Sequence, residues 1–569
     1  MKNKFIFLIT LFSSVFITLN SQVNFQWAVS YGSIGFDYAY SNTVDGAGNV
    51  YTTGVFTGTV DFDPGAGVYN LIGSPGGGDI FISKLDGAGN FIWAKRIGGM
   101  GPDGGFSLTV DALNNLYLTG IFVGTVDFDP SAAVYNLSSI GSNDVFIIKL
   151  DATGSFVWAK SFGGFNNDFG YSIAVDVSGN VYTTGYFYGT VDFDPGVGVF
   201  NLASSGNKDI FLNKLDASGI FVWSKNIGGT TDDWGSSVVV DVTNKVYITG
   251  FFSGTMDFDP GVGITNITSA GQEDIFVSKF DQSGNFLWGK AMGGTLSDWG
   301  SSIAVDVSGN VYSTGYFNST ADFDPGVGVS NLTSVGTAGM SDIFITKLDA
   351  VGTFVWARQM GGLGNDNSTS ISLDGIGNIY ITGIFELTAD FDPGIGVYNF
   401  TSAGAQDVFI NKLDVSGNFV WAKQLGSSGF DVGQSIKLDG SSNVFLTGYF
   451  QNTVDFDPGV GIYNMTYAGG YDIFILKLSN TVGIEEKDNS INSVNIFPNP
   501  NTGAFKLQIT NDLKNGELIL INSIGERVCE QTVIQGVNTI NANNLSKGLY
   551  NYILLSDKQK VAGGKIVLE

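Results

Sequence analysis

The chain has 569 residues, 80 of them glycine, and a formal net charge of −26. Such an acidic protein is a poor partner for nucleic acid or for an anionic membrane surface. The sequence contains no histidine and a single cysteine, which excludes Ser-His-Asp and Cys-His catalysis, the commonest transition-metal ligand, and a fold that depends on disulfides.

The first residues, 1–21, predict a secretory signal peptide. Lysines precede an apolar run from Phe5 to Leu19, and the small Ser21 stands before Gln22 at the expected cleavage edge. The run is too short for a comfortable membrane span, and no cysteine follows it that could carry a lipid anchor. We therefore expect an exported protein whose mature chain has no transmembrane segment.

Residues 22–480 consist of one repeated unit, which the motif Asp-Phe-Asp-Pro marks most clearly. Its copies follow one another at intervals of 65 to 68 residues, a period that indicates a repeat architecture. The first aspartate of the motif stands at Asp61, Asp127, Asp192, Asp257, Asp322, Asp390 and Asp455.

Each unit contains four strand signals, seen clearly between residues 168 and 229. They cover Tyr171–Asp176, Val181–Phe187, Ile210–Leu215 and Phe221–Ile227, with tight turns after the first and the third. Apolar residues on both faces of the third strand indicate a sheet that is covered on both sides. Four-stranded sheets stacked around an axis, as in a β-propeller, meet that requirement. A β-solenoid is the rival, but its coils are usually far shorter than this unit.

The two ends of the array predict how it closes. A tryptophan marks the fourth strand, and the first one, Trp27, precedes the first complete unit. The last third strand, Asp472–Leu478, has no tryptophan strand after it. In a ring, Asn24–Tyr31 would complete the last blade. We therefore expect an all-β fold, a seven-bladed β-propeller with N-terminal strand closure.

The repeat also predicts where the acidic residues gather. The loops after the second and fourth strands share one face of a propeller, so this face should hold both aspartates of Asp-Phe-Asp and those typified by Asp168 and Asp209. The positions typified by Asp176 and Asp216 should lie on the opposite face. The first face carries the longest loops, where the binding residues of a rigid scaffold usually lie.

Strand alternation points the two aspartates of each Asp-Phe-Asp motif the same way. Paired carboxylates beside glycine carbonyls would suit Ca²⁺, a hard cation that takes six to eight oxygen ligands. The candidate ligands are Asp61, Asp63, Asp127, Asp129, Asp192, Asp194, Asp257, Asp259, Asp322, Asp324, Asp390, Asp392, Asp455 and Asp457. The favoured interpretation is that Asp-Pro-Gly is a β-turn in which aspartate bonds its own backbone. No EF-hand spacing is present, one copy carries Ser131 and Ala132 in place of the glycine pattern, and no other cofactor is expected.

Two further motifs, Asp-x-x-Gly-Asn-x-x-Trp-Ala-Lys and Val-Asp-x-x-Gly-Asn-Val-Tyr-x-Thr-Gly, recur through residues 22–480. With them the chain resembles the bacterial seven-bladed β-propeller repeat family SBBP, whose members are commonly exported and lack an assigned activity. The Asp-x-x-Gly-x-x-x-Trp portion is also similar to the tryptophan motif of quinoprotein dehydrogenases. Those are typically eight-bladed and need a quinone and metal site, for which the sequence offers no residue set, so that alternative rests on fold analogy alone.

The repeat stops near residue 480, and a polar stretch, 481–493, has the composition of a linker. Residues 494–569 then show Asn-Ile-Phe-Pro-Asn-Pro-Asn-Thr-Gly (495–503), Gly-Leu-Tyr (548–550) and a terminal Lys-Ile-Val-Leu-Glu (565–569). This pattern resembles the C-terminal sorting domain of the type IX secretion system of Bacteroidota. The resemblance implies a small β-sandwich that directs passage across the outer membrane and has the type IX secretion machinery as its partner. A generic accessory β-sandwich is the alternative.

Two classes of function stay open. We favour an exported, non-enzymatic binding module that recognises a protein, glycan or cation through the acidic face and reaches the cell surface or the medium by type IX secretion. The alternative is a secreted hydrolase or lyase that uses aspartates, because paired carboxylates can do acid–base work without histidine, or a quinoprotein-like enzyme. An enzyme is less favoured because the candidate carboxylates recur in every blade, whereas catalysis usually needs one distinct set of residues in a single place. The residues that depart from the repeat are Asp232, Trp234, Glu273, Trp299 and Glu386.

Overall fold

The computed structural model describes residues 22–337, 339–481, 494–510, 513–522, 526–557 and 559–568, which contain strands and no α-helix. They fall into two compact units, one within 22–481 and one within 494–568. The predicted signal peptide, Ser21 included, and residues 482–493 of the predicted linker lie outside the described residues. The domain boundaries on either side of them stay predictions.

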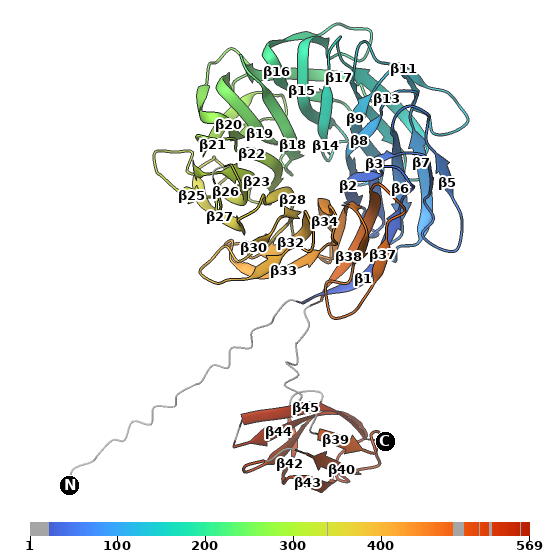
Figure 1. Cartoon of the computed structure of the whole chain (residues 1–569), viewed down its shortest axis with the longest axis vertical. Coiled ribbons are helices and arrows are strands. Elements are labelled where there is room, and N and C mark those ends of the chain that lie inside the picture. The colour runs from blue at the N-terminus through green and yellow to red at the C-terminus, as the bar shows by residue number, and fades with distance from the viewer. Residues whose placement is uncertain are drawn as a thin grey trace, which may run out of the picture. The chain divides into compact units, whose positions relative to one another are not determined.

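In the larger unit each repeat folds into four antiparallel strands in chain order, and the sheets stand around a central axis (Figure 1). The first strands lie nearest this axis. They are β2 (Tyr38–Val44), β8 (Gly104–Val110), β14 (Phe169–Val175), β18 (Asp233–Val240), β22 (Trp299–Val305), β28 (Asn367–Leu373) and β34 (Val432–Leu438). The second strands are β3 (Val50–Phe56), β9 (Leu116–Phe122), β15 (Val181–Asp192), β19 (Val246–Asp257), β23 (Val311–Asn318), β29 (Ile379–Phe385) and β35 (Val444–Phe450).

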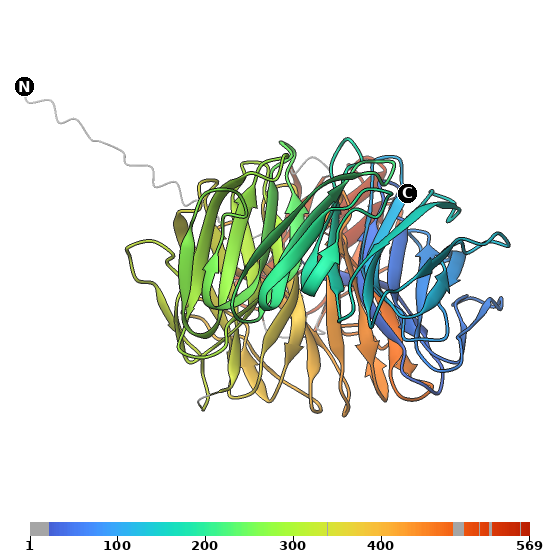
Figure 2. The same cartoon turned by 90° about the horizontal axis from the view of Figure 1, so that it is seen from above.

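The third and fourth strands complete each sheet toward the outside. The third strands are β6 (Asp79–Leu85), β12 (Asp144–Leu150), β16 (Asn201–Leu215), β20 (Asn266–Phe280), β26 (Ser341–Leu348), β32 (Asp407–Leu413) and β38 (Asp472–Thr481). The fourth strands are β7 (Phe91–Ile97), β13 (Phe156–Phe162), β17 (Phe221–Gly229), β21 (Phe286–Gly294), β27 (Phe354–Gly362), β33 (Phe419–Leu425) and β1 (Gln22–Tyr31). Figure 2 shows these sheets from the side, with their strands running between the two faces of the unit.

The Asp-Phe-Asp motif lies in a hairpin inserted between the second and third strands, which we call the insertion hairpin. In the third and fourth repeats its strands are continuous with β15–β16 and β19–β20, so those strands run past the predicted ends at Phe187 and Ile210. Elsewhere the hairpins, at the outer edge in Figure 1, are β4 (Thr59–Asp61) with β5 (Asn70–Ile72), β10 (Thr125–Asp127) with β11 (Asn136–Ser138), β24 (Thr320–Asp322) with β25 (Asn331–Thr333), β30 (Thr388–Asp390) with β31 (Asn399–Thr401), and β36 (Thr453–Asp455) with β37 (Asn464–Thr466).

The hydrophobic core lies between neighbouring sheets. The third strands are buried on both faces, as the sequence predicts: Ile210, Phe211 and Leu212 of β16 are all fully buried. Phe211 packs in one cluster with Val145 of the preceding repeat, whereas Ile210 packs in another with Val246 of the following repeat. Each sheet therefore buries one face against each neighbour, which is the packing expected of propeller-like repeats.

The N-terminal strand belongs to the sheet formed by the last repeat. β1 pairs antiparallel with β38, with Trp27 opposite Lys477, in a sheet of order β1-β38-β35-β34. On the other side of this sheet, Ser435 Oγ donates to Asn42 Oδ1 of β2 (2.9 Å). Among the described residues some neighbouring repeats are joined by short ladders, because β17 pairs with β19, β21 with β24 and β27 with β30, but no single closed sheet forms.

The smaller unit consists of two antiparallel sheets around one hydrophobic cluster that includes Leu507, Leu520 and Ile566, as in a β-sandwich. One sheet has the order β39 (Val494–Phe497), β40 (Ala504–Ile509), β43 (Gly536–Asn541). The other has the order β42 (Arg527–Thr532), β41 (Glu517–Ile521), β44 (Gly548–Ser556), β45 (Gln559–Leu568).

Candidate functional site

The aspartates of Asp-Phe-Asp shape the insertion hairpin. In the third repeat, Asp192 Oδ1 accepts hydrogen bonds from the backbone N–H of Asp194 (3.1 Å) and of Phe200 (2.8 Å), and Asp194 Oδ1 accepts one from Gly196 N–H (2.8 Å). The equivalent bonds are made by the pairs Asp61–Asp63, Asp127–Asp129, Asp257–Asp259, Asp322–Asp324, Asp390–Asp392 and Asp455–Asp457. These bonds confirm the prediction that the aspartates form turns.

Calcium binding by the same pairs stays a prediction. Over the described residues, no three or more His, Cys, Asp or Glu side chains are gathered in a way that could hold a metal ion. The oxygens that Ca²⁺ needs beyond one carboxylate pair would therefore have to come from backbone carbonyls or water.

A second set of aspartates, typified by Asp168, is buried. Asp168 Oδ2 accepts from Gly164 N–H (2.7 Å) and Oδ1 from Tyr188 N–H (2.9 Å), so the carboxylate ties the loop before the first strand to the second strand. Burial raises the pKa of Asp168 to about 7. The same two bonds recur at Asp37, Asp103, Asp233, Asp298, Asp366 and Asp431.

The aspartates that open the third strands, typified by Asp209, are buried as well. Asp209 Oδ2 accepts from Ser205 N–H (2.8 Å), and burial raises the pKa of its equivalent Asp144 to about 6. The prediction of an acidic binding face is therefore wrong for two of its four acidic positions. The reason is that backbone N–H donors in the loops draw these carboxylates inward, which the residue type alone does not reveal.

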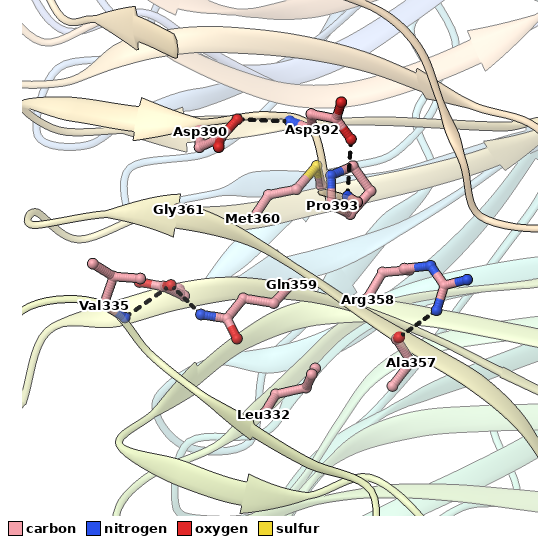
Figure 3. A pocket seen from close by; sticks show the side chains of 12 residues that line it. Leu332, Val335, Ala357, Arg358, Gln359, Met360, Gly361, Asp390, Asp392 and Pro393 are labelled. Atoms are coloured by element: carbon pink, nitrogen blue, oxygen red, sulfur yellow. Dashed lines mark hydrogen bonds between the residues drawn. The ribbon is translucent and has the colours of Figure 1, made fainter. Parts of the chain in front are cut away.

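One pocket lies beside an insertion hairpin and holds about 330 Å³ (Figure 3). We call it the outer pocket. Its polar groups are already paired: Asp390 accepts from Asp392 N–H (3.0 Å), Asp342 accepts from Gln359 Nε2 (2.8 Å), and Arg358 Nη1 donates to Ala357 O (2.9 Å). Most of its lining also belongs to the repeat pattern, so little of it is peculiar to this place.

Aromatic residues on the first strands form a belt around the axis. We define this aromatic belt as Tyr38, Tyr40, Phe106, Phe169, Tyr171, Trp234 and Trp299, from β2, β8, β14, β18 and β22. Its ring centroids lie 5.3 Å apart for Tyr40–Phe106, 5.6 Å for Phe106–Tyr171, 4.7 Å for Tyr171–Trp234 and 5.5 Å for Trp234–Trp299. Rings at these separations pack favourably on one another.

The belt is interrupted at β28 and β34. Where β14 carries Phe169 and Tyr171, β28 carries Asn367 and Thr369, and a cavity of about 320 Å³ opens there. We call it the axial pocket. It is lined by the aromatic rings of Trp299, Tyr316 and Tyr449, the amides of Asn367, Gln406 and Gln434, the hydroxyls of Ser301, Ser368 and Thr369, and the apolar Ile384 and Val432. None of these lining side chains is charged.

The lining is partly fixed by hydrogen bonds and partly free. Trp299 Nε1 donates to Ser236 Oγ (3.2 Å), which holds the indole, and Thr369 Oγ1 donates to Gly433 O (2.6 Å). Burial, followed by the Glu273 and Asp298 carboxylates, raises the pKa of Tyr316 to about 12, so its hydroxyl is neutral and able to donate. Within the described part of the chain, no partner is found for the Tyr316 hydroxyl.

The other residues that depart from the repeat surround the belt without lining the axial pocket. Asp232 pairs with Lys208 (3.5 Å), whose ammonium lies 5.4 Å from the Trp234 ring. Glu386 accepts from Gln406 Nε2 (2.9 Å) and so orients an amide of the lining. Glu273 accepts from Ser297 Oγ.

Two known families match the chain. Residues 495–569 match the secretion system C-terminal sorting domain, and residues 157–186, 288–324 and 355–383 match the SBBP β-propeller repeat. The chain carries SBBP propeller repeats and a type IX sorting domain. Through this sorting domain the SBBP-repeat protein is exported by type IX secretion to the cell surface or the medium. No helix of the described residues has the length and apolarity needed to cross a membrane.

Similar proteins share the repeat region at low identity. An uncharacterized WD repeat-containing protein of Acanthamoeba polyphaga mimivirus is 26% identical over 439 residues, 64% of this chain and 31% of that protein. The regulatory protein FlaEY of Caulobacter vibrioides is 26% identical over 380 residues, 64% of this chain and 37% of that protein. The chain thus spans about a third of the length of these curated relatives. Among solved structures, Sqt1 from Chaetomium thermophilum is 10% identical with a TM-score of 0.38, covering 81% of this chain and 100% of its own.

Sequence reasoning singled out Trp299 but missed most of the axial pocket. Asn367, Thr369 and Gln434 drew no notice because each is an ordinary polar residue on a strand. Their signal is a departure from the repeat: aligned on Phe169 and Tyr171, β28 and β34 are the first strands that carry an aromatic residue at neither position.

Proposed function

We propose that the protein is an exported, non-enzymatic binding module built on a seven-bladed β-propeller that β1 closes, and that its ligand binds in the axial pocket. The observation that carries this proposal is the pocket that opens where the aromatic belt is interrupted at β28 and β34. The scaffold is the same in every repeat, whereas a specific binding site requires a set of residues that occurs at one place only. The axial pocket is such an arrangement, and pockets lined by aromatic residues with a few polar groups are the usual form of a small-molecule site.

The pairing of β1 with β38 supports closure by the N-terminal strand. A chain that begins at Ile34 lacks β1, exposes the edge of β38 and loses Trp27 from the packing. We expect a loss of several kcal/mol in the free energy of unfolding. Thermal melting of this truncated chain beside the mature chain measures the loss, and equal melting curves would disprove closure by β1.

The chemistry of the lining favours binding over catalysis. Acid–base catalysis requires a group that titrates near the working pH at the reacting atoms. The titratable side chains that line the axial pocket are Tyr316 and Tyr449, and burial raises the pKa of each to about 12, so neither is ionised near neutral pH. The buried aspartates of each repeat are already engaged by backbone N–H groups, as Asp298 is by those of Gly294 (2.6 Å) and Asn318 (2.9 Å). The hydrolase and quinoprotein alternatives gain no support from these contacts.

We expect the C-terminal domain to be needed for export and the propeller to fold and bind without it. Deleting Val494–Glu569 in a host with type IX secretion should abolish delivery to the surface or the medium, while the propeller still folds. Cell fractionation followed by thermal melting of the retained protein tests both points. Unchanged delivery would refute the role of this domain as the export signal.

The binding proposal is tested by screening the full mature chain against arrays of glycans, peptides and proteins. Two variants are screened beside it. Trp299→Ala removes one wall of the axial pocket, and Phe169→Leu changes the equivalent position of the third repeat, which lies outside the pocket. A ligand bound by the mature chain and by Phe169→Leu, but lost by Trp299→Ala, supports the proposal. Binding that all three proteins share places the site elsewhere.

A further inference from the structure

We infer that the axial pocket binds a neutral saccharide, through a sugar ring laid against Trp299. This inference rests on the proposed function of the axial pocket and narrows it to one class of ligand. A pyranose ring has an apolar C–H face and an edge of hydroxyl groups, so its site must offer an aromatic surface together with uncharged hydrogen-bonding groups. The axial pocket offers both.

The aromatic surface is held in place before any ligand arrives. The Trp299 ring is packed against Trp234 at 5.5 Å and against Phe251 at 4.2 Å, and its Nε1–H is bound to Ser236 Oγ at 3.2 Å. Its remaining surface contributes to the lining, with Tyr316 at 6.1 Å beside it. A fixed aromatic wall loses little conformational entropy when a ligand packs on it.

The polar groups match the edge of a sugar. Side-chain amides and hydroxyls both donate and accept hydrogen bonds, as sugar hydroxyls do. Asn367 has its Oδ1 engaged by Ser341 Oγ (2.7 Å), and Gln406 has its Nε2 engaged by Glu386 (2.9 Å). Because Asn367 Oδ1 is engaged, its Nδ2 is left to donate to a ligand. Because Gln406 Nε2 is engaged, its Oε1 is left to accept.

Charge decides against other ligands of similar size. The lining has no cation to pair with a carboxylate, sulfate or phosphate, and the chain as a whole carries −26. An acidic glycan or an acidic peptide would enter a site of the same sign and find no counter-ion. A neutral glycan meets no such barrier. The volume, about 320 Å³, lies at the small end of the range of roughly 300–1,000 Å³ found for ligand pockets, which suits the end of a chain better than its middle.

The test is a calorimetric titration of the full mature chain with short neutral oligosaccharides of glucose, mannose, galactose and N-acetylglucosamine. Uronic acid oligosaccharides and acidic peptides form a parallel panel. Two variants disrupt the axial pocket, one by removing its aromatic wall and one by filling its volume. Trp299→Ala takes away the stacking wall, and Thr369→Tyr fills the pocket with the residue that Tyr171 supplies at the same position of the third repeat. Phe169→Leu is the matched control, and circular dichroism with thermal melting confirms that each variant is folded.

We expect a neutral oligosaccharide to bind, with an affinity at least about ten-fold weaker in Trp299→Ala and Thr369→Tyr and unchanged in Phe169→Leu. If only acidic oligosaccharides or peptides bind, and both pocket variants abolish that binding, the inference about neutral saccharides is overturned while the axial pocket remains the binding site. If no probe loses affinity in either pocket variant, both the inference and the proposed site are overturned.

Discussion

The four-stranded sheet and the insertion hairpin of one repeat use aspartate and glycine in different ways. In the fourth repeat, buried Asp233 accepts from Gly229 N–H (2.6 Å) and Ser253 N–H (3.1 Å), two separate segments of chain. Asp257 of the hairpin accepts from Asp259 N–H (3.1 Å) and Thr265 N–H (2.8 Å), within its own turn. The location of the donors, not the residue type, thus decides whether a carboxylate is buried. The buried aspartate of the sheet thus joins two segments, whereas the aspartate of the hairpin closes a local turn.

The largest expected effect is a difference in stability between glycine substitutions in the sheet and in the hairpin. In the sheet, a Cβ on Gly250 would overlap the carbonyl oxygen of Trp234, and backbone has little room to move, so Gly250→Ala should cost about 3 kcal/mol or more. In the hairpin, a Cβ on Gly263 would meet only the end of the Asp259 side chain, and Ala133 already stands at this position in the second repeat. Gly263→Ala should cost less than about 1 kcal/mol. Urea unfolding midpoints measure the stability of both variants. Equal losses of stability would show that the sheet and the hairpin tolerate an added Cβ equally well.

A similar contrast is expected for the aspartates. Asp233→Ala leaves the buried N–H of Gly229 and the part-buried N–H of Ser253 without an acceptor and should cost about 2–4 kcal/mol. Both N–H groups left by Asp257→Ala are only part-buried, so that variant should cost about 1 kcal/mol or less. Both are measured as shifts of the urea midpoint of the mature chain. Equal losses of stability in the two variants would show that the buried carboxylate and the turn carboxylate contribute alike.

The buried aspartates should also make the stability depend on pH. Burial raises the pKa of Asp233, Asp298 and Asp366 to about 7, whereas unfolded aspartate titrates near 3.9. The folded chain thus holds these protons more tightly, and the resulting stabilisation is fully present below about pH 4 and is lost as the pH rises through about 7. We expect the melting temperature to fall by a few degrees between about pH 5 and pH 8. Combining Asp233→Asn with Asp298→Asn should flatten the curve, and a melting temperature that rises over this interval would contradict the assignment.

The smallest effect is expected from calcium. If the Asp-Phe-Asp pairs only form turns, millimolar calcium and NaCl at equal ionic strength should change the melting temperature alike. Changing Asp192 and Asp194 to Asn should then be mild. A shift of many degrees that a chelator reverses, and that these substitutions reduce, would establish calcium sites in the hairpins instead.

Much of the propeller can be predicted from its sequence because the repeat copies each local signal many times. The turn at Asp176, the strand Val181–Phe187 and the paired ends marked by Trp27 and Asp472 all stand out once the copies are aligned. β1 pairs with β38, the strand beside which the orphan fourth strand was expected to lie. Strand ends were less well predicted, because in two repeats the hairpin ladder is continuous with the sheet.

The axial pocket could not be predicted in the same way. It joins residues of three repeats that are far apart in sequence, such as Ser301, Thr369 and Gln434, and no local pattern brings them together. The repeat shows which positions face the axis, but only the structure shows that Trp299 and Tyr449 line the same pocket. The burial of Asp168 was missed for a related reason, since its donors, Gly164 and Tyr188, belong to different elements.

The antiparallel pairing of β1 with β38, which we call the seam, affects the order in which the protein can fold. Gln26 Nε2 bonds Ser479 Oγ at 3.0 Å although the two residues are 453 positions apart, so the N-terminal strand has no partner until nearly the whole propeller has been synthesised. Earlier sheets contact only their neighbours and can form as they emerge, whereas this sheet requires the closure of a very long loop, which is entropically costly and slow. We expect seam formation to be the last kinetic phase of refolding. A circular permutant that joins β38 directly to β1 and opens the chain between two other sheets should lose that phase, because its seam has become a local hairpin.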